Sequence, residues 1–268
     1  MALKDITLGQ YFPGDSILHR LDPRTKILLT VIYIVALFLA KQIVGYGILL
    51  LVLAAAIMVS KVKLKVILKG LKPILFIIII TGILNLFWTP GDVIWEWGFL
   101  KLTVQGVWAA VFKVLRISML IICTFLLTYT TSPILLTDGL ESLLGPLKKI
   151  HVPVHELAMM MSIALRFIPT LIEETDKIMS AQKARGADFD TGSLLDKAKA
   201  LIPLLVPLFI SAFRRADELA VAMECRCYHG GEGRTRMRQL KYRATDVLFL
   251  AAGLALCVAI GVLRHFGL

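Results

Sequence analysis

Residues 43–60 read IVGYGILLLVLAAAIMVS and contain no charged side chain. As an α-helix this stretch is about 27 Å long, close to the roughly 30 Å thickness of the hydrocarbon core of a membrane. An uninterrupted apolar run of this length is typical of a transmembrane helix. The stretch therefore predicts that the chain crosses a membrane.

Four more runs of the same kind surround it, at 27–40, 73–88, 104–131 and 245–263. Charge enters these runs only at Lys113, Arg116 and Asp246. The runs at 27–40 and 43–60, with the two residues between them, would together make a helix of about 51 Å. This is too long for one crossing, so we expect a tight hairpin between the two runs. The chain is 57% hydrophobic and 18% charged, with a mean hydropathy of +0.78, far more apolar than a soluble domain. We expect an all-α integral membrane protein with about five transmembrane helices.

The Lys and Arg residues that give the net charge of +11 are distributed unequally between the two sides of the membrane. Of the 30 Lys and Arg residues, 25 lie in three blocks, at 1–26, 61–72 and 132–243. The loops on the opposite side hold Lys41, Lys101 and Arg264. Because Lys and Arg concentrate in cytoplasmic loops, the N-terminus is predicted to be cytoplasmic and the C-terminus to lie outside. This topology accounts for the basic excess, so we expect no nucleic-acid partner.

The composition divides the chain into four parts. Residues 1–26 form a cytoplasmic N-terminal segment, 27–131 a membrane region of four spans, 132–243 a cytoplasmic-side region, and 244–268 a final transmembrane helix. Asp22 followed by Pro23 predicts the start of the first span, because Asp is a good N-cap and Pro fits the first helical position.

Two long amphipathic helices are expected in the cytoplasmic-side region, at 156–185 and 194–226. Their apolar faces follow the 3, 4 spacing of a helix and include Met160, Met161, Leu165, Leu204 and Leu208. Charged residues occupy the opposite faces, which does not fit a helix surrounded by lipid. We expect the two helices to form a platform along the membrane surface or beneath a membrane-embedded partner.

The ends of these helices repeat at an offset of 41 residues. The first ends in Ala184-Arg185-Gly186 and the second in Cys225-Arg226-Cys227. Two interpretations are open. An Arg in the last turn stabilises a helix through its dipole, whereas a forked donor between small neighbours is suited to a carboxylate in a groove of a partner. Two copies favour a dimeric partner, or a pair of similar subunits.

Catalytic motifs are absent from the sequence. It contains no G-x-x-x-x-G-K-[ST] motif for ATP and no H-E-x-x-H motif. Cys225, Cys227 and His229 could hold a soft metal ion, but no fourth ligand accompanies them. We expect no catalytic residue, no metal and no cofactor, and predict that the chain is not an enzyme. Lys113 and Arg116 either mark an ion path or pack against another span.

The N-terminal segment carries a family resemblance. Residues 9–16 read GQYFPGDS and residues 19–26 read HRLDPRTK. With residues 166–169, which read RFIP, and the two Arg-centred helix ends, they resemble the transmembrane coupling component of energy-coupling factor transporters. The likeness covers essentially the whole chain. One departure is the second helix end, where the family usually has an Ala-Arg-Gly-like sequence and this chain has Cys-Arg-Cys.

The resemblance implies an ABC-type uptake system for vitamins or metal ions, in bacteria. In such a system this component joins two cytoplasmic ATPases, identical or different, to a small substrate-binding membrane subunit. ATPase docking is carried over to Ala184, Arg185, Gly186, Cys225, Arg226 and Cys227. The long helices would be coupling helices whose apolar faces hold the substrate-binding subunit.

Two alternatives come from other classes. A conventional ABC permease subunit would bind substrate itself and needs a polar cavity in the membrane, for which the spans offer little beyond Asn85 and Thr124. An intramembrane enzyme would need acidic, His or metal groups that converge within the spans, and none is apparent.

The predicted topology can be tested by labelling single cysteines in a cysteine-free variant in intact cells. A membrane-impermeant reagent should label a cysteine near position 96, on the outer side, and leave one at position 200 unlabelled. Labelling at 200, or its absence near 96, would contradict the orientation.

Overall fold

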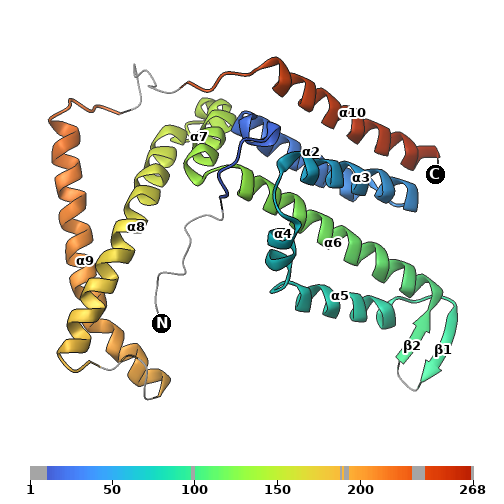
Figure 1. The fold of residues 1–268 in the computed structure, drawn as a ribbon, viewed down its shortest axis with the longest axis horizontal. Coiled ribbons are helices and arrows are strands. Elements are labelled where there is room, and N and C mark those ends of the chain that lie inside the picture. The colour runs from blue at the N-terminus through green and yellow to red at the C-terminus, as the bar shows by residue number, and fades with distance from the viewer. Residues whose placement is uncertain (1–10, 98–99, 188, 190–192, 231–238, 267–268) are drawn as a thin grey trace. The chain divides into compact units, whose positions relative to one another are not determined.

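The computed structural model describes residues 11–97, 100–187, 189, 193–230 and 239–266 (Figure 1). It contains two compact units. We call residues 9–139 with 240–268 the bundle unit, and residues 140–239 the long-helix unit. Gly9 and Gln10 of the family-like N-terminal segment lie outside the described residues, as do the last two residues of the predicted final helix.

The bundle unit consists of helices and one β-hairpin. Its elements are α1 (Ile17–Arg20), α2 (Pro23–Leu39), α3 (Ile43–Ser60), α4 (Leu64–Leu71), α5 (Leu75–Trp88), β1 (Val93–Trp97), β2 (Leu100–Thr103), α6 (Val104–Thr130) and α10 (Ala244–Phe266). Helix α5 packs along α6, and α10 packs along α2 (Figure 1). Helix α7 (Pro133–Leu144) straddles the division between the units at residue 139.

The long-helix unit is built from α8 (Val154–Ala184) and α9 (Leu194–Glu224), preceded by a 3-10 turn (Gly145–Ile150). Ser193 and Asp196 form a reciprocal capping box at the start of α9, which satisfies two backbone donors of its first turn. Pro169 lies inside α8, and Pro203 and Pro207 lie inside α9. The two predicted amphipathic helices are therefore present, each 31 residues long.

Four of the described helices are long and apolar enough to cross a membrane: α3, α6, α8 and α10. Helices α4 and α5 provide a fifth crossing if they form one span bent by 62°. The predicted all-α fold with about five spans is confirmed, but the set differs. Helix α2 has 17 residues, about 26 Å, and is slightly shorter than these. Helix α8 meets the length and hydropathy required of a span because most of its charged residues lie in its second half, which leaves the first half apolar.

Two details correct the sequence interpretation. The predicted span 73–88 begins only at Leu75, and α5 alone, about 21 Å long, is too short for a roughly 30 Å core. The preceding loop instead contains α4, and Pro73 lies in the break between them because it lacks an N–H group. The hairpin β1–β2, antiparallel and irregular between Val93 and Trp95, was not predicted.

The core of the bundle unit lies where α2, α3, α6 and α10 meet. It contains Tyr33, Ala36, Leu37, Ala40, Tyr46, Leu49, Leu53, Met119, Cys123 and Ile260. The outward faces are apolar as well. Phe38 on α2, Leu51 on α3 and Val258 on α10 are each more than half exposed. A surface of this kind is stable against lipid chains, not water.

A buried polar junction joins the start of α2 to the start of α10. Asp22 caps α2 by accepting from the Arg24 N–H at 2.9 Å, and its own N–H donates to Asp246 Oδ1 at 2.8 Å. Asp246 Oδ2 accepts from the Arg243 N–H at 2.8 Å, and Asp246 is 1% exposed. Burial raises the pKa of the Asp22 carboxyl group. The hydrogen bonds and the positive charge of Arg24 together lower this pKa by more than burial raises it, so it lies below its usual range and Asp22 is ionised at neutral pH.

Lys26 extends this junction to α6. Its Nζ donates to the carbonyl oxygens of Thr130 at 2.9 Å and His19 at 3.2 Å. The N–H of Phe12 donates to the Tyr129 carbonyl at 3.0 Å. The described part of the family-like N-terminal segment thus ties together the ends of three helices, which is a structural role.

The two cations inside α6 also pack against other helices. Arg116 donates to the Tyr46 hydroxyl at 2.8 Å and to the Ala40 carbonyl, at the end of α2, at 3.2 Å. Lys113 donates to the Asn85 side-chain carbonyl on α5. Of the two interpretations of these residues, the structure supports packing against another span.

Candidate functional site

The candidate site comprises the two Arg-centred helix ends, which we call the first tip (Ala184, Arg185, Gly186) and the second tip (Cys225, Arg226, Cys227). At the first tip the Gly186 N–H donates to the Lys183 carbonyl at 3.0 Å, and the Ala187 N–H reaches back to the Gln182 carbonyl at 3.0 Å. Gly186 has φ +87°. This pattern is the Schellman motif, in which a left-handed residue closes a helix.

The second tip repeats the same backbone pattern with different residues. The Cys227 N–H donates to the Glu224 carbonyl at 2.8 Å, and the Tyr228 N–H donates to the Met223 carbonyl at 3.1 Å. Cys227 has φ +54° and takes the left-handed place that Gly186 has at the first tip. Every donor and acceptor in this motif lies 41 residues after its counterpart, so the sequence repeat is also a structural repeat.

Neither arginine is used to close its helix. The backbone bonds already satisfy the terminal carbonyls, and the Arg185 and Arg226 side chains are exposed. Within the described part of the chain, neither guanidinium makes a hydrogen bond or an ion pair. Neither side chain is therefore a hydrogen-bonding cap, and both are exposed for contact with another molecule. The interpretation through the helix dipole stays open beside the docking one.

Contacts between α8 and α9 place the tips at opposite ends of the long-helix unit. Gln182, near the end of α8, donates to the carbonyl of Pro203, the tenth residue of α9, at 3.4 Å. Further along, Arg215 donates to Glu174 at 2.7 Å. The helices thus run in opposite directions (Figure 1). From Pro203 to the second tip, α9 extends roughly 30 Å, which sets the separation of the tips.

The predicted apolar contact residues fall into different environments. Met160 is 54% exposed and Met161 is 45% exposed. Leu165 and Leu208 are half-buried, whereas Leu204 is 5% exposed and belongs to the packing inside the structure. Sequence periodicity could not separate these roles because α9 is apolar on more than one face. Its strongly exposed apolar residues, absent from the sequence prediction, include Val206, Phe209, Ile210 and Phe213.

Sequence reasoning also missed the residues that close the tips, Ala187 and Tyr228. The signal was available, since both follow from extending the 41-residue offset beyond the arginines. Among the described residues, no group of three or more His, Cys, Asp or Glu side chains is arranged to hold a metal ion. Cys225 and Cys227 are exposed and free.

Comparison with known proteins shows which family this chain belongs to. Residues 14–237 match the family CbiQ, described as cobalt transport protein. The chain is 59% identical to the energy-coupling factor transporter transmembrane protein EcfT of Ruminiclostridium cellulolyticum, over 92% of each chain. It is 54% identical to EcfT of Acidaminococcus fermentans over 98% of each. The chain belongs to the EcfT family.

This membership confirms the resemblance drawn from the N-terminal segment and the tips. EcfT of Bacillus subtilis, 48% identical over 98% of this chain and 99% of its own, carries the same description. The protein is a multi-pass transmembrane subunit of an energy-coupling factor transporter, and the ATPases of such transporters are separate proteins. The prediction that this EcfT-family chain is not itself an enzyme is confirmed.

The left-handed conformation at the second tip makes a prediction about Cys227. The left-handed conformation costs a non-glycine residue about 1–2 kcal/mol of folding free energy. A glycine avoids this cost, but it loses more backbone entropy on folding, which offsets part of the gain. Cys227→Gly should change stability by at most about 1 kcal/mol, whereas the β-branched Cys227→Val should lower it. Thermal unfolding of the purified protein would measure this. Equal behaviour of the Val variant and the wild type would contradict it.

Proposed function

We propose that the long-helix unit transmits the ATP-driven movement of two cytoplasmic ATPases to a separate, small substrate-binding membrane subunit, for uptake of a vitamin or another micronutrient. The observation that carries this proposal is the pair of matched tips. Two identical backbone motifs present two exposed, unpaired guanidinium groups at opposite ends of one antiparallel helix pair. A pair of similar ATPases offers two equivalent places for them.

The chemistry of each tip suits insertion into an acidic groove. A guanidinium presents a planar fork of donors that fits a carboxylate in two parallel hydrogen bonds. At the first tip, no described atom beyond the adjoining backbone lies within 4 Å of where a Cβ on Gly186 would be, so a groove wall can approach the backbone there. Force on a tip passes directly into the helix behind it, because the Schellman bonds join tip and helix.

Glu174 and Arg215 provide the connection between the two long helices. Their 2.7 Å ion pair joins α8 to α9, and the two residues are themselves 41 positions apart. Both side chains are partly shielded from water, at 22% and 34% exposure. The pair therefore fixes the crossing of the helices at equivalent positions, and a shift of one tip is passed to the other helix.

The exposed apolar faces of α8 and α9 would hold the substrate-binding subunit. Met160 and Met161 present flexible thioether side chains, which adapt to partners of different shape. Phe209 and Phe213 on α9 are 60% and 68% exposed. Exposed aromatic and methionine side chains together are typical of a partner contact.

The lining of the cavities in the bundle unit does not favour the alternative of a permease that binds substrate itself. One cavity of about 760 Å³ is large enough for a small molecule. Its polar neighbours, however, are hydrogen-bonded within the chain: Lys26 to two carbonyls, Thr30 to the Lys26 carbonyl, Tyr33 to the Leu49 carbonyl and Thr130 to the Leu126 carbonyl. The rest of the lining is almost entirely apolar, so a polar vitamin would find few partners there.

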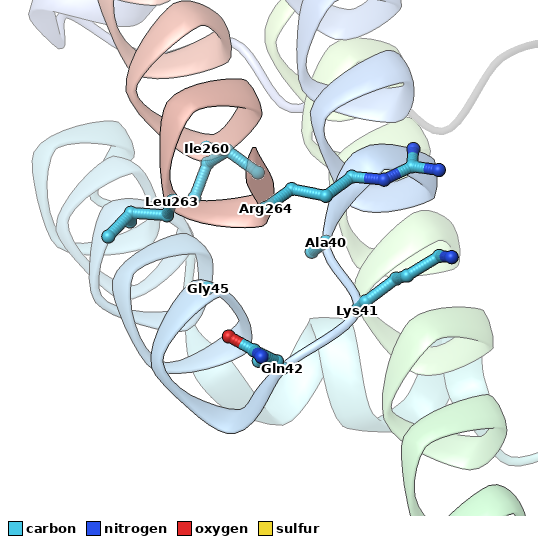
Figure 2. A pocket seen from close by; sticks show the side chains of 7 residues that line it. All are labelled: Ala40, Lys41, Gln42, Gly45, Ile260, Leu263 and Arg264. Carbon is cyan, nitrogen blue, oxygen red and sulfur yellow. The ribbon is translucent and has the colours of Figure 1, made fainter. Parts of the chain in front are cut away.

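A second cavity, of about 60 Å³, is too small for such a substrate. It lies between the turn that joins α2 to α3 and the end of α10. Figure 2 shows Lys41 and Arg264 extending to the same side from these two elements, away from Ile260 and Leu263. Both cations belong to the side predicted to face outward.

Removing the arginines tests the docking proposal. Truncating one partner of a desolvated Arg–carboxylate pair costs about 2–5 kcal/mol, since the other charge stays buried. Arg185→Ala and Arg226→Ala should therefore each weaken ATPase attachment roughly 30- to several-thousand-fold. Lys should rescue in part, because it keeps the charge and loses the fork. Copurified ATPase and substrate uptake would be measured at equal amounts of folded protein.

Lys177→Ala and Arg214→Ala are matched controls, since both remove an exposed cation from the same helices away from the tips. They should leave attachment unchanged. Normal uptake in the double variant Arg185→Ala, Arg226→Ala would disprove docking through the tips.

The apolar contact makes a separate prediction. Replacing Met160 and Met161 with Asp would bury two charges in the contact at a cost of several kcal/mol. The small membrane subunit should be lost from the purified complex while the ATPases stay. Glu173→Lys, an equally exposed change on the far side of α8, should retain both partners. Leu204→Asp should instead disrupt the structure, because that side chain is internal. Retention of the small subunit by the Met variant would show that this face is not its binding site.

A further inference from the structure

The 760 Å³ cavity of the bundle unit is a cleft between helices. Its floor is formed by buried residues of α2 and α6, among them Tyr33, Cys123 and Leu126. Its sides are formed by α3 and α10, where small residues leave the space open: Ala55, Ala56, Ala252, Gly253, Ala255 and Ala259. Several of these small residues are exposed, so the cleft opens sideways from the bundle.

The cleft occupies one half of the membrane depth. It runs from Lys26 to Tyr33 along α2 and from Phe249 to Ala259 along α10, which is about 10–15 Å of helix. One leaflet of the hydrocarbon core is about 15 Å deep. At the other end of the unit α3 and α10 approach each other, with Ile260 Cδ1 3.8 Å from where a Cβ on Gly45 would lie. The cleft is thus wide on the predicted cytoplasmic side and closed on the opposite side.

Its walls select an apolar occupant. Its described lining is apolar except for Lys26, Thr30, Tyr33, Cys123 and Thr130. The Lys, Thr and Tyr side chains each donate to a carbonyl oxygen within the chain, so ordered water finds few partners there. A space of this size inside the membrane does not stay empty, since its lining would lose contacts on one side. Lipid chains fill the surrounding core and reach the cleft through its side opening.

The rim of the cleft carries positive charge. Arg20 lies between the lining residues Leu18 and Leu21, and Lys61 and Lys63 follow the lining residue Val59; all three cations are exposed. Of the acidic groups near the rim, Asp22 and Asp246 are buried and hydrogen-bonded, and Asp15 is exposed in the N-terminal segment. Clusters of Lys and Arg at a cytoplasmic membrane surface attract anionic lipid headgroups.

We propose that this cleft binds an acyl chain of an anionic phospholipid of the cytoplasmic leaflet, whose headgroup contacts Arg20, Lys61 and Lys63. The lipid fills the space between α3 and α10 and is a structural part of the bundle unit. This site is separate from the tips, so it does not depend on how the ATPases dock.

The test uses the complete transporter complex, purified from its membrane and placed in bilayer discs of phosphatidylglycerol and phosphatidylcholine in equal amounts. Native mass spectrometry would count the phospholipids released with the complex and identify their headgroups. The wild type should retain phosphatidylglycerol in preference to phosphatidylcholine. Ala255→Leu combined with Ala56→Leu fills the cleft and should abolish this retention. Ala251→Leu, an exposed α10 residue that does not line the cleft, should leave it unchanged.

A second variant leaves the packing intact. Arg20→Gln with Lys61→Gln should reduce the preference for phosphatidylglycerol roughly 30-fold, since each cation near the surface contributes about fivefold, with an unchanged unfolding temperature. Equal lipid retention in the filled variant and the wild type would overturn the proposal. So would retention without headgroup preference, or loss of the small membrane subunit from the filled variant with lipid unchanged, which would make that subunit the occupant.

Discussion

The buried carboxylate of Asp246 joins parts of the bundle unit that are far apart in the sequence. It accepts from the N–H groups of Asp22 and Arg243, so one side chain closes the starts of α2 and α10 together. A carboxylate this buried is stable only while its hydrogen bonds are made. Lys26 adds the end of α6 through the Thr130 carbonyl. The hydrocarbon core supplies no hydrogen bonds, so buried polar groups at helix ends beside it must find partners within the protein.

The same requirement explains the polar groups deeper in the bundle. Arg116 donates to the carbonyl at the end of α2, where the helix dipole is negative, and to the Tyr46 hydroxyl on α3. Lys113 pairs with Asn85. These side chains hold α6 against three neighbouring helices at places where apolar packing alone would allow sliding. In a membrane, such bonds give a bundle its register, since apolar contacts with lipid and with helices are nearly equal.

The features that could be predicted from the sequence were those that depend on local signals. The Asp22–Pro23 helix start, the long apolar runs and the two amphipathic helices each depend on residues within a few turns. The partner of Asp22 could not be predicted, because Asp246 is 224 positions away and a single buried Asp in an apolar run has many possible partners. The β-hairpin was missed because its strands are short. For the tips, the repeat identified both arginines, but an apolar helix such as α9 does not reveal that Leu204 faces inward.

The two tips have a consequence for symmetry. The long-helix unit carries one backbone motif twice, at a fixed offset and with two different residues, Gly186 and Cys227, in its left-handed position. Under the proposed docking, a single asymmetric chain meets both halves of a two-fold symmetric partner with the same contact. Because the two copies of the motif lie in one polypeptide, their sequences can diverge independently. If a partner with two identical subunits were replaced by one with two different subunits, only one tip would need to change.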